Sequence, residues 1–125
     1  MAEHNIIGQK GEEVACETMR KKGFRVVDTN WKFGHLEMDV IAVSKKEIAF
    51  VEVKTRRESV QAPPQESVDW RKQQRIVKAA QSFLKSGKGK PYGSHECMFD
   101  VVAVTFCGDE YITEWIPHAF IPLYR

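Results

Sequence analysis

Residues 36–56 read LEMDVIAVSKKEIAFVEVKTR, and this stretch decides the fold. Two apolar runs flank Lys45 and Lys46, a pattern that predicts a β-hairpin closed by a two-residue turn. The runs are rich in Val and Ile, which suit a pleated, half-buried surface. Charged residues nevertheless lie inside the predicted strands, where an unpaired charge is costly to bury: Glu37, Asp39, Glu52 and Lys54.

The predicted turn fixes which residues face each other across the hairpin. Because side chains alternate between the two faces of a strand, Asp39 is expected opposite Glu52, and Glu37 opposite Lys54. Near the turn this face is apolar, and the other face is apolar throughout, from Met38 onward. A hairpin with one solvated face would explain alternating charges, but not the apolar residues beside them. We therefore expect a sheet that is covered on both sides.

Two carboxylates that face each other repel unless a cation neutralises them. Carboxylate oxygens suit Mg²⁺ or Mn²⁺, so Asp39 and Glu52 are predicted metal ligands. The backbone carbonyl of Val53 would add an oxygen, water would complete the octahedron, and Lys54 would project beside the ion. The competing interpretation is a buried salt-bridge network in which Glu37 pairs with Lys54. Isolated buried ion pairs add little net stability, so a network accounts poorly for the excess of acids.

Two helices are predicted, one on each side of this hairpin in the sequence. An apolar stripe at helical spacing predicts the first over residues 9–22, with Gly23 as its C-terminal cap. The second is predicted over residues 68–86, with Glu66 or Ser67 near its start.

Three further strands complete the predicted sheet. β-rich runs place them at residues 24–31, 99–106 and 110–116. The run ESVQAPPQES carries two prolines and no periodicity, so it is expected to be a loop. The predicted fold is an α/β sandwich in one domain, residues 1–125, in which two main helices flank a mixed sheet of about five strands.

Composition is that of an ordinary globular protein, with 42% hydrophobic and 29% charged residues. No apolar run reaches the ~20 residues of a transmembrane helix, and the N-terminus lacks the order of a signal peptide. A cytoplasmic location is therefore expected. The three cysteines are widely spaced and form no CxxC pair, so neither a disulfide framework nor a zinc site is predicted.

The net charge of +2 hides a local basic excess. Residues 71–90 hold seven Lys or Arg and no acid. Nucleic acid is a natural partner for such a stretch, and a solvated helix face explains it equally well.

Glu12 and Gln73 place polar groups on the core-facing stripes of the two predicted helices. Each lies near the start of its helix. A solvated helix end is the alternative explanation for both positions.

Several motifs together resemble a known family. Asp39 is followed thirteen residues later by Glu52 and then Lys54, which resembles the PD-(D/E)XK nuclease signature carried on a hairpin. More narrowly, Gly11 with Glu12, LEMDVIA, FVEVKTR, RKQQRIVKAAQSFL and FDVVAV resemble, in this order, the YraN-type family of bacterial proteins. That family is similar to archaeal Holliday-junction resolvases. Met38 departs from the pattern, since it replaces the proline of the superfamily's name.

The resemblance implies a restriction-endonuclease-like fold and assigns roles to individual residues. Glu12 would be a further acid near the metal, with Glu37 as an additional candidate, and Gln73 a polar residue of the active site. The implied catalytic set is Asp39, Glu52, Lys54 and Gln73, and the implied metal set is Asp39, Glu52, Val53 and Glu12. Basic residues expected to contact DNA phosphates are Arg56, Arg57, Arg71, Lys72, Arg75 and Lys78.

The function expected from these observations is Mg²⁺-dependent hydrolysis of DNA phosphodiesters, with Mn²⁺ as a substitute and branched DNA as a plausible substrate. A homodimer would fit by analogy with resolvases, which cut two strands symmetrically. The main rival is a nuclease-like domain that binds nucleic acid without cutting it. A small interaction module with a buried salt-bridge network is the third alternative.

Overall fold

The computed structural model describes residues 2–58 and 69–120. Its elements in chain order are α1 (Ala2–Lys21), β1 (Arg25–Phe33), β2 (Leu36–Val43), β3 (Glu47–Arg57), α2 (Trp70–Lys85), the short 3₁₀ helix η2 (Lys90–Tyr92), β4 (Glu96–Cys107) and β5 (Glu110–Ile116). The strands form one five-stranded sheet in the order β1-β2-β3-β4-β5. Only β3 and β4 pair in parallel, and α2 connects them in the chain.

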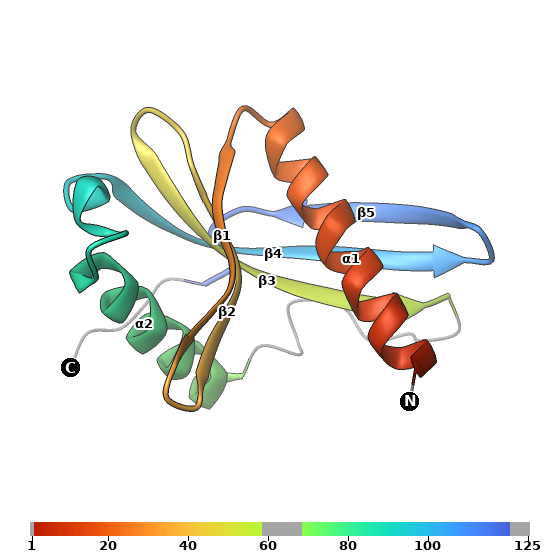
Figure 1. Ribbon diagram of the computed structural model, residues 1–125. Helices are drawn as coiled ribbons and strands as arrows, with labels where there is room; N and C mark the ends of the chain where they lie inside the picture. Colours follow the sequence, from red (N-terminus) through yellow and green to blue (C-terminus); the bar gives the residue numbers. More distant parts are fainter. Residues whose placement is uncertain (1, 59–68, 121–125) are drawn as a thin grey trace.

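The two helices lie on opposite sides of the strands, as Figure 1 shows. The α1 side is filled by a cluster that contains Ala15, Met19, Val40 and Val51. A second cluster fills the α2 side, where Phe83 meets Phe50 edge-on. This arrangement confirms the predicted α/β sandwich with a mixed five-stranded sheet and two main helices, and it is consistent with a restriction-endonuclease-like fold.

Both helices differ from their predicted bounds at the N-terminal end. α1 begins at Ala2, well before residue 9, because the apolar stripe that predicts the helix, Ala15 to Met19, lies in its C-terminal half. α2 begins at Trp70, where the Asp69 carboxylate caps it by accepting a hydrogen bond from the Lys72 N–H at 2.9 Å. The predicted starts at residues 66–68 lie outside the described residues. Among the described residues, no helix is long and apolar enough to cross a membrane.

The predicted hairpin register is confirmed only near the turn. Val43 pairs with Ile48 and Ile41 with Phe50, but the ladder between β2 and β3 ends at Val40 and Val51. The predicted cross-strand pairs Asp39–Glu52 and Glu37–Lys54 are therefore wrong as ladder pairs. On the N-terminal side of Val40, the described residues of β2 pair with β1 alone, where Glu37 pairs with Lys32.

Met38 marks the place where β2 changes its relation to the two cores. It packs in the α2-side cluster, whereas Val40 and Ala42 pack in the α1-side cluster. The prediction that Met38 shares a face with Val40 is therefore wrong, because the strict alternation of a strand is interrupted at Asp39. This interruption coincides with the end of the β2–β3 ladder and opens a gap between the two strands.

Candidate active site

A pocket of about 450 Å³ lies where β2 and β3 separate. Residues from both helices and both strands meet there, which brings together parts of the chain that are distant in sequence. Its lining residues are Ile7, Gly8, Glu12, Asp39, Glu52, Val53, Lys54, Thr55 and Lys72. The two acids predicted as metal ligands thus line one pocket, together with Val53, Lys54 and Glu12, although the sheet register does not pair them.

Asp39 occupies the gap left by the end of the ladder. Its Oδ2 accepts a hydrogen bond from the backbone N–H of Val53 at 2.8 Å, so the carboxylate satisfies a donor that no β2 carbonyl reaches. Burial and the negative charge of Glu52 raise the pKa of Asp39 to about 7, against the lowering effect of the Val53 hydrogen bond. The charge of Glu52 reaches Asp39 even though the two residues do not pair in the ladder.

Glu52 is buried and forms ion pairs with two lysines. Its Oε1 lies 2.7 Å from Lys72 Nζ and 3.6 Å from Lys54 Nζ. Burial and the neighbouring Lys72 lower the pKa of Lys54. Burial alone would lower the pKa of Lys72 as well, but the hydrogen bond to Glu52 and the charges of both acids outweigh it and raise that pKa. The two lysines thus respond in opposite directions to the same buried carboxylate environment.

Glu12 lines the pocket next to a close contact between α1 and β3. A Cβ on Gly11 would clash with the Thr55 side chain, so only glycine permits this approach. On its other side, Glu12 Oε1 accepts a hydrogen bond from Asn30 Nδ2 at 2.9 Å. Asn30 has a left-handed φ of 53° and follows a β-bulge in β1, so the local backbone aims this amide at Glu12.

The donor set at this pocket fits a hard divalent cation. Asp39 and Glu52 supply carboxylate oxygens, and burial together with the charge of Glu52 raises the pKa of Asp39. The N–H and C=O of one strand residue point to the same neighbouring strand, so the Val53 carbonyl is directed into the same gap as its N–H. Among the described residues, no three His, Cys, Asp or Glu side chains are grouped closely enough to form a metal site alone. Mg²⁺ suits a site of this kind, because it keeps several waters and needs few protein carboxylates.

Other predicted residues lie around the pocket rather than in its lining. Gln73 is half-buried on α2 next to Lys72 but does not line the pocket, and Glu37 is exposed on β2. The predicted DNA contacts sit at the end of β3 and along α2, and all are at least partly accessible: Arg56, Arg57, Arg71, Lys72, Arg75 and Lys78.

Two side chains that bind the predicted acids are not predicted to do so from the sequence, Lys72 at Glu52 and Asn30 at Glu12. Lys72 was placed among phosphate contacts, yet it lies one helical turn before the buried Ile76, and that spacing was the available signal. Asn30 falls inside the strand predicted over residues 24–31, which gives it no role at Glu12. Its signal was weaker, because Asn is depleted in strands and tolerates the left-handed conformation.

The chain matches known proteins over most of its length. The model of the uncharacterised protein family UPF0102 matches residues 11–104. A UPF0102 protein of Stutzerimonas stutzeri is 38% identical over 120 residues, which cover 96% of this chain and 98% of the relative. A UPF0102 protein of Bacteroides thetaiotaomicron is 34% identical over 98% of both chains, and one of Caldanaerobacter subterraneus is 38% identical over 90% of this chain and 89% of its own. This chain therefore belongs to the UPF0102 family, which confirms the YraN-type assignment made from its motifs.

Proposed function

We propose that this protein is a metal-dependent endonuclease of the PD-(D/E)XK superfamily, which hydrolyses phosphodiesters of DNA. The observation that carries the proposal is the grouping of Asp39, Glu52 and Lys54 around one pocket beside a basic helix. The order of these three residues on a hairpin also matches the superfamily signature.

Each residue has a distinct role in this mechanism. Asp39, Glu52 and the Val53 carbonyl would hold Mg²⁺, with Glu12 as a further acid nearby. The bound ion would polarise a phosphoryl oxygen and lower the pKa of a water molecule. Lys54, with its pKa lowered by burial, would orient the attacking water or stabilise the charge that develops on the phosphoryl group.

The basic residues of α2 and of the end of β3 would bind the DNA backbone. Contacts of this kind carry no base sequence and weaken steeply with salt. A branched DNA is a suitable substrate, because its shape can be recognised without base-specific contacts. Symmetric cutting of such a branch would require a homodimer.

Cleavage of labelled DNA tests this proposal. Purified protein is incubated with branched and linear DNA in Mg²⁺ or Mn²⁺, beside the variants Asp39→Asn and Lys54→Ala. We expect cleavage by the native chain that depends on added metal and falls at least 100-fold in either variant. Equal cleavage by all three proteins would identify a contaminating nuclease and refute the catalytic assignment.

A domain that binds DNA without cutting it is the second candidate. One observation favours it, because Lys72 already places a cation 2.7 Å from Glu52, where the nuclease would hold its metal. Such a protein would bind DNA in a salt-dependent manner that Asp39→Asn leaves unchanged. It would also take up no Mg²⁺ or Mn²⁺ in calorimetric titrations, whereas the nuclease would bind either ion.

A further inference from the structure

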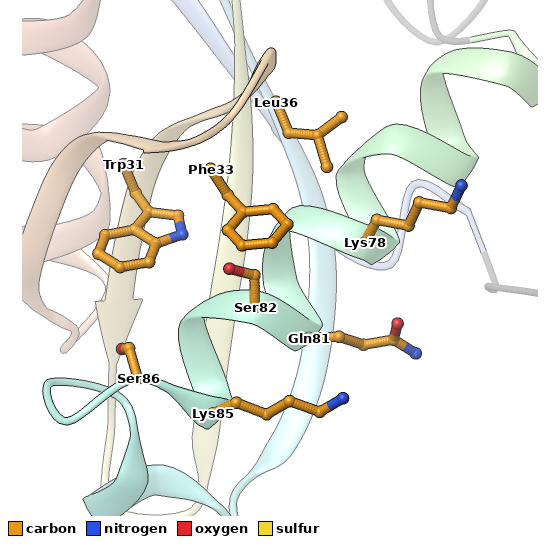
Figure 2. A pocket seen from close by; sticks show the side chains of 8 residues that line it. All are labelled: Trp31, Phe33, Leu36, Lys78, Gln81, Ser82, Lys85 and Ser86. Carbon is orange, nitrogen blue, oxygen red and sulfur yellow. The ribbon is translucent and has the colours of Figure 1, made fainter.

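A second pocket of about 520 Å³ lies between the β1–β2 hairpin and the exposed side of α2. Figure 2 shows Trp31, Phe33 and Leu36 of the hairpin on one side, with Ser82 and Ser86 toward them, while the long polar side chains of α2 extend away from Trp31 in this view. We call this pocket the hairpin groove. It is lined by Trp31, Phe33, Leu36, Lys78, Gln81, Ser82, Lys85 and Ser86.

The hairpin wall exposes aromatic surface to solvent. Phe33 is 57% accessible although it is a large apolar residue. Behind it, the indole N–H of Trp31 is buried and has no hydrogen-bond partner among the described residues. Figure 2 shows this nitrogen on the side of the ring that faces Phe33 and Ser82. An exposed aromatic face above an unpaired buried donor is not explained by packing within the chain.

The helix wall is basic. Lys78 and Lys85 both line the hairpin groove, and none of its eight lining residues is acidic. Helical spacing places Lys78 and Lys85 on the same side of α2 as Arg71 and Arg75. A continuous basic stripe therefore runs along α2 from the end that carries Lys72 to the hairpin groove.

The hairpin groove lies close to the candidate active site. Leu36 precedes Asp39 by three residues on β2, a distance of about 10 Å along a strand. Lys78 follows Lys72 by six residues on α2, which is about 9 Å along a helix. Along either element, the nearest residue of the hairpin groove is thus about 10 Å from the candidate active site. At ~3.4 Å of rise per nucleotide, this corresponds to on the order of three nucleotides.

From these observations we infer that the hairpin groove binds an unpaired nucleotide of the DNA strand whose phosphodiester lies at Asp39 and Glu52. The inference rests on the proposed function. The base stacks on the exposed ring of Phe33, and the flanking phosphates lie against Lys78 and Lys85. A flap, gap or branch point supplies unpaired bases, whereas a fully paired duplex does not.

The charge of the groove favours nucleic acid over a second copy of this chain. In a symmetric dimer the same surface patch contributes from both subunits. Docking through the hairpin groove would bring the basic stripe of α2 against the same stripe of the other copy. A polyanion neutralises Lys78 and Lys85 instead, and it offers flat bases to the aromatic wall.

The test measures selectivity, defined as the dissociation constant for a paired duplex divided by that for a duplex of equal charge with a three-nucleotide gap. Fluorescence anisotropy in EDTA keeps the DNA uncut. We expect the native chain to prefer gapped DNA and Phe33→Leu to lower the selectivity about tenfold, since Leu offers no plane for stacking. Phe33→Tyr keeps an aromatic ring at this position and should retain the selectivity of the native chain. Ile112→Ala, at an exposed apolar residue of β5, is the matched control and should leave it unchanged.

Each of the following outcomes would overturn the inference. If the native chain binds both DNAs equally, or Phe33→Leu leaves the selectivity intact, the hairpin groove takes no base, while the proposed nuclease stands on its own cleavage assay. If Phe33→Leu instead converts a dimer to a monomer in sedimentation, with unchanged selectivity, the occupant is a second copy. If the native chain binds neither DNA in EDTA, the hairpin groove takes no base, and the cleavage assay with added metal still decides the proposed function.

Discussion

Lys72 Nζ lies 2.7 Å from Glu52 Oε1, so an ion pair joins the first turn of α2 to the centre of the sheet. Lys54 approaches the same oxygen less closely, at 3.6 Å. Because Glu52 is buried, the ammonium group of Lys72 is a close partner for a side chain that would otherwise be costly to bury. A divalent cation bound at Glu52 would also neutralise this carboxylate. Removing the Lys72 ammonium group and adding Mg²⁺ therefore tests whether the ion can replace the lysine.

Lys72→Met should destabilise the metal-free protein by about 1–2 kcal/mol, less than for a fully buried pair because Lys54 remains nearby. Added Mg²⁺ should then stabilise the variant more than the native chain, since the ion replaces the lost ammonium. Thermal unfolding with and without Mg²⁺ measures both effects. Lys78→Met, at an exposed lysine of the same helix, is the control. An equal Mg²⁺ response in all three proteins would show that no cation binds at Glu52.

Asp39→Asn should change how stability depends on pH. The pKa of Asp39 is raised from 3.8 to about 7, so between these values the folded state holds a proton that the unfolded state has lost. Stability of the metal-free native chain should therefore fall as pH rises from about 4 to 7. Asn is neutral and can still accept from the Val53 N–H. At pH 8 the free energy of unfolding of the variant should therefore exceed that of the native chain by on the order of 1 kcal/mol.

Urea unfolding at pH 4 and pH 8 provides this comparison, and the difference between the two proteins removes the contribution of other titrating groups. With Mg²⁺ present at pH 8 the order should reverse, because only the native chain offers a full carboxylate to the ion. Parallel stability profiles for the two proteins would mean that Asp39 titrates normally.

Asn30 should influence Mg²⁺ binding only by positioning Glu12. Asn30→Gly accepts the left-handed backbone but removes the amide that Glu12 binds at 2.9 Å, so the fold should be retained while Mg²⁺ affinity drops about tenfold. Glu12→Gln should cause a similar drop, and the double variant should be no worse than either single one. Calorimetric titration with Mg²⁺ measures these affinities. If the losses of affinity from the two single variants add up in the double variant, Asn30 and Glu12 act independently. Asn30→Ala should cost a further ~1 kcal/mol of stability from backbone strain.

Gly11→Ala should destabilise the protein by about 1–3 kcal/mol, because the new methyl group meets the Thr55 side chain. Gly8→Ala on the same helix is the matched control, since a Cβ there meets no atom within 4 Å. That control should gain about 0.5–1 kcal/mol from helix propensity. Thr55→Ala should partly rescue Gly11→Ala in denaturant unfolding. Equal stability of the two glycine variants would contradict the close packing of α1 on β3.

Much of the fold follows from local sequence signals. The Lys45–Lys46 turn sets the register up to Val40, and the apolar stripe around Phe83 marks the face of α2 that packs on the sheet. Gly23 ends α1 with a φ of 94°, as its predicted role as C-terminal cap requires. These features depend on side-chain period and on the conformational freedom of single residues. Both can be read without knowing what the element packs against.

The sequence by itself determined that Asp39, Glu52 and Lys54 would lie on one hairpin of a covered mixed sheet. It could not determine how they meet, because a strict two-residue alternation pairs Asp39 with Glu52, whereas β2 pairs with β3 only from Val40 to Val43. Only the tertiary structure decided that the carboxylate of Asp39 fills the resulting gap and that Lys72 reaches Glu52. The physical reason is that alternation is a local property of one chain segment. The end of a ladder and the partner of a buried charge depend on where the two helices dock on the sheet.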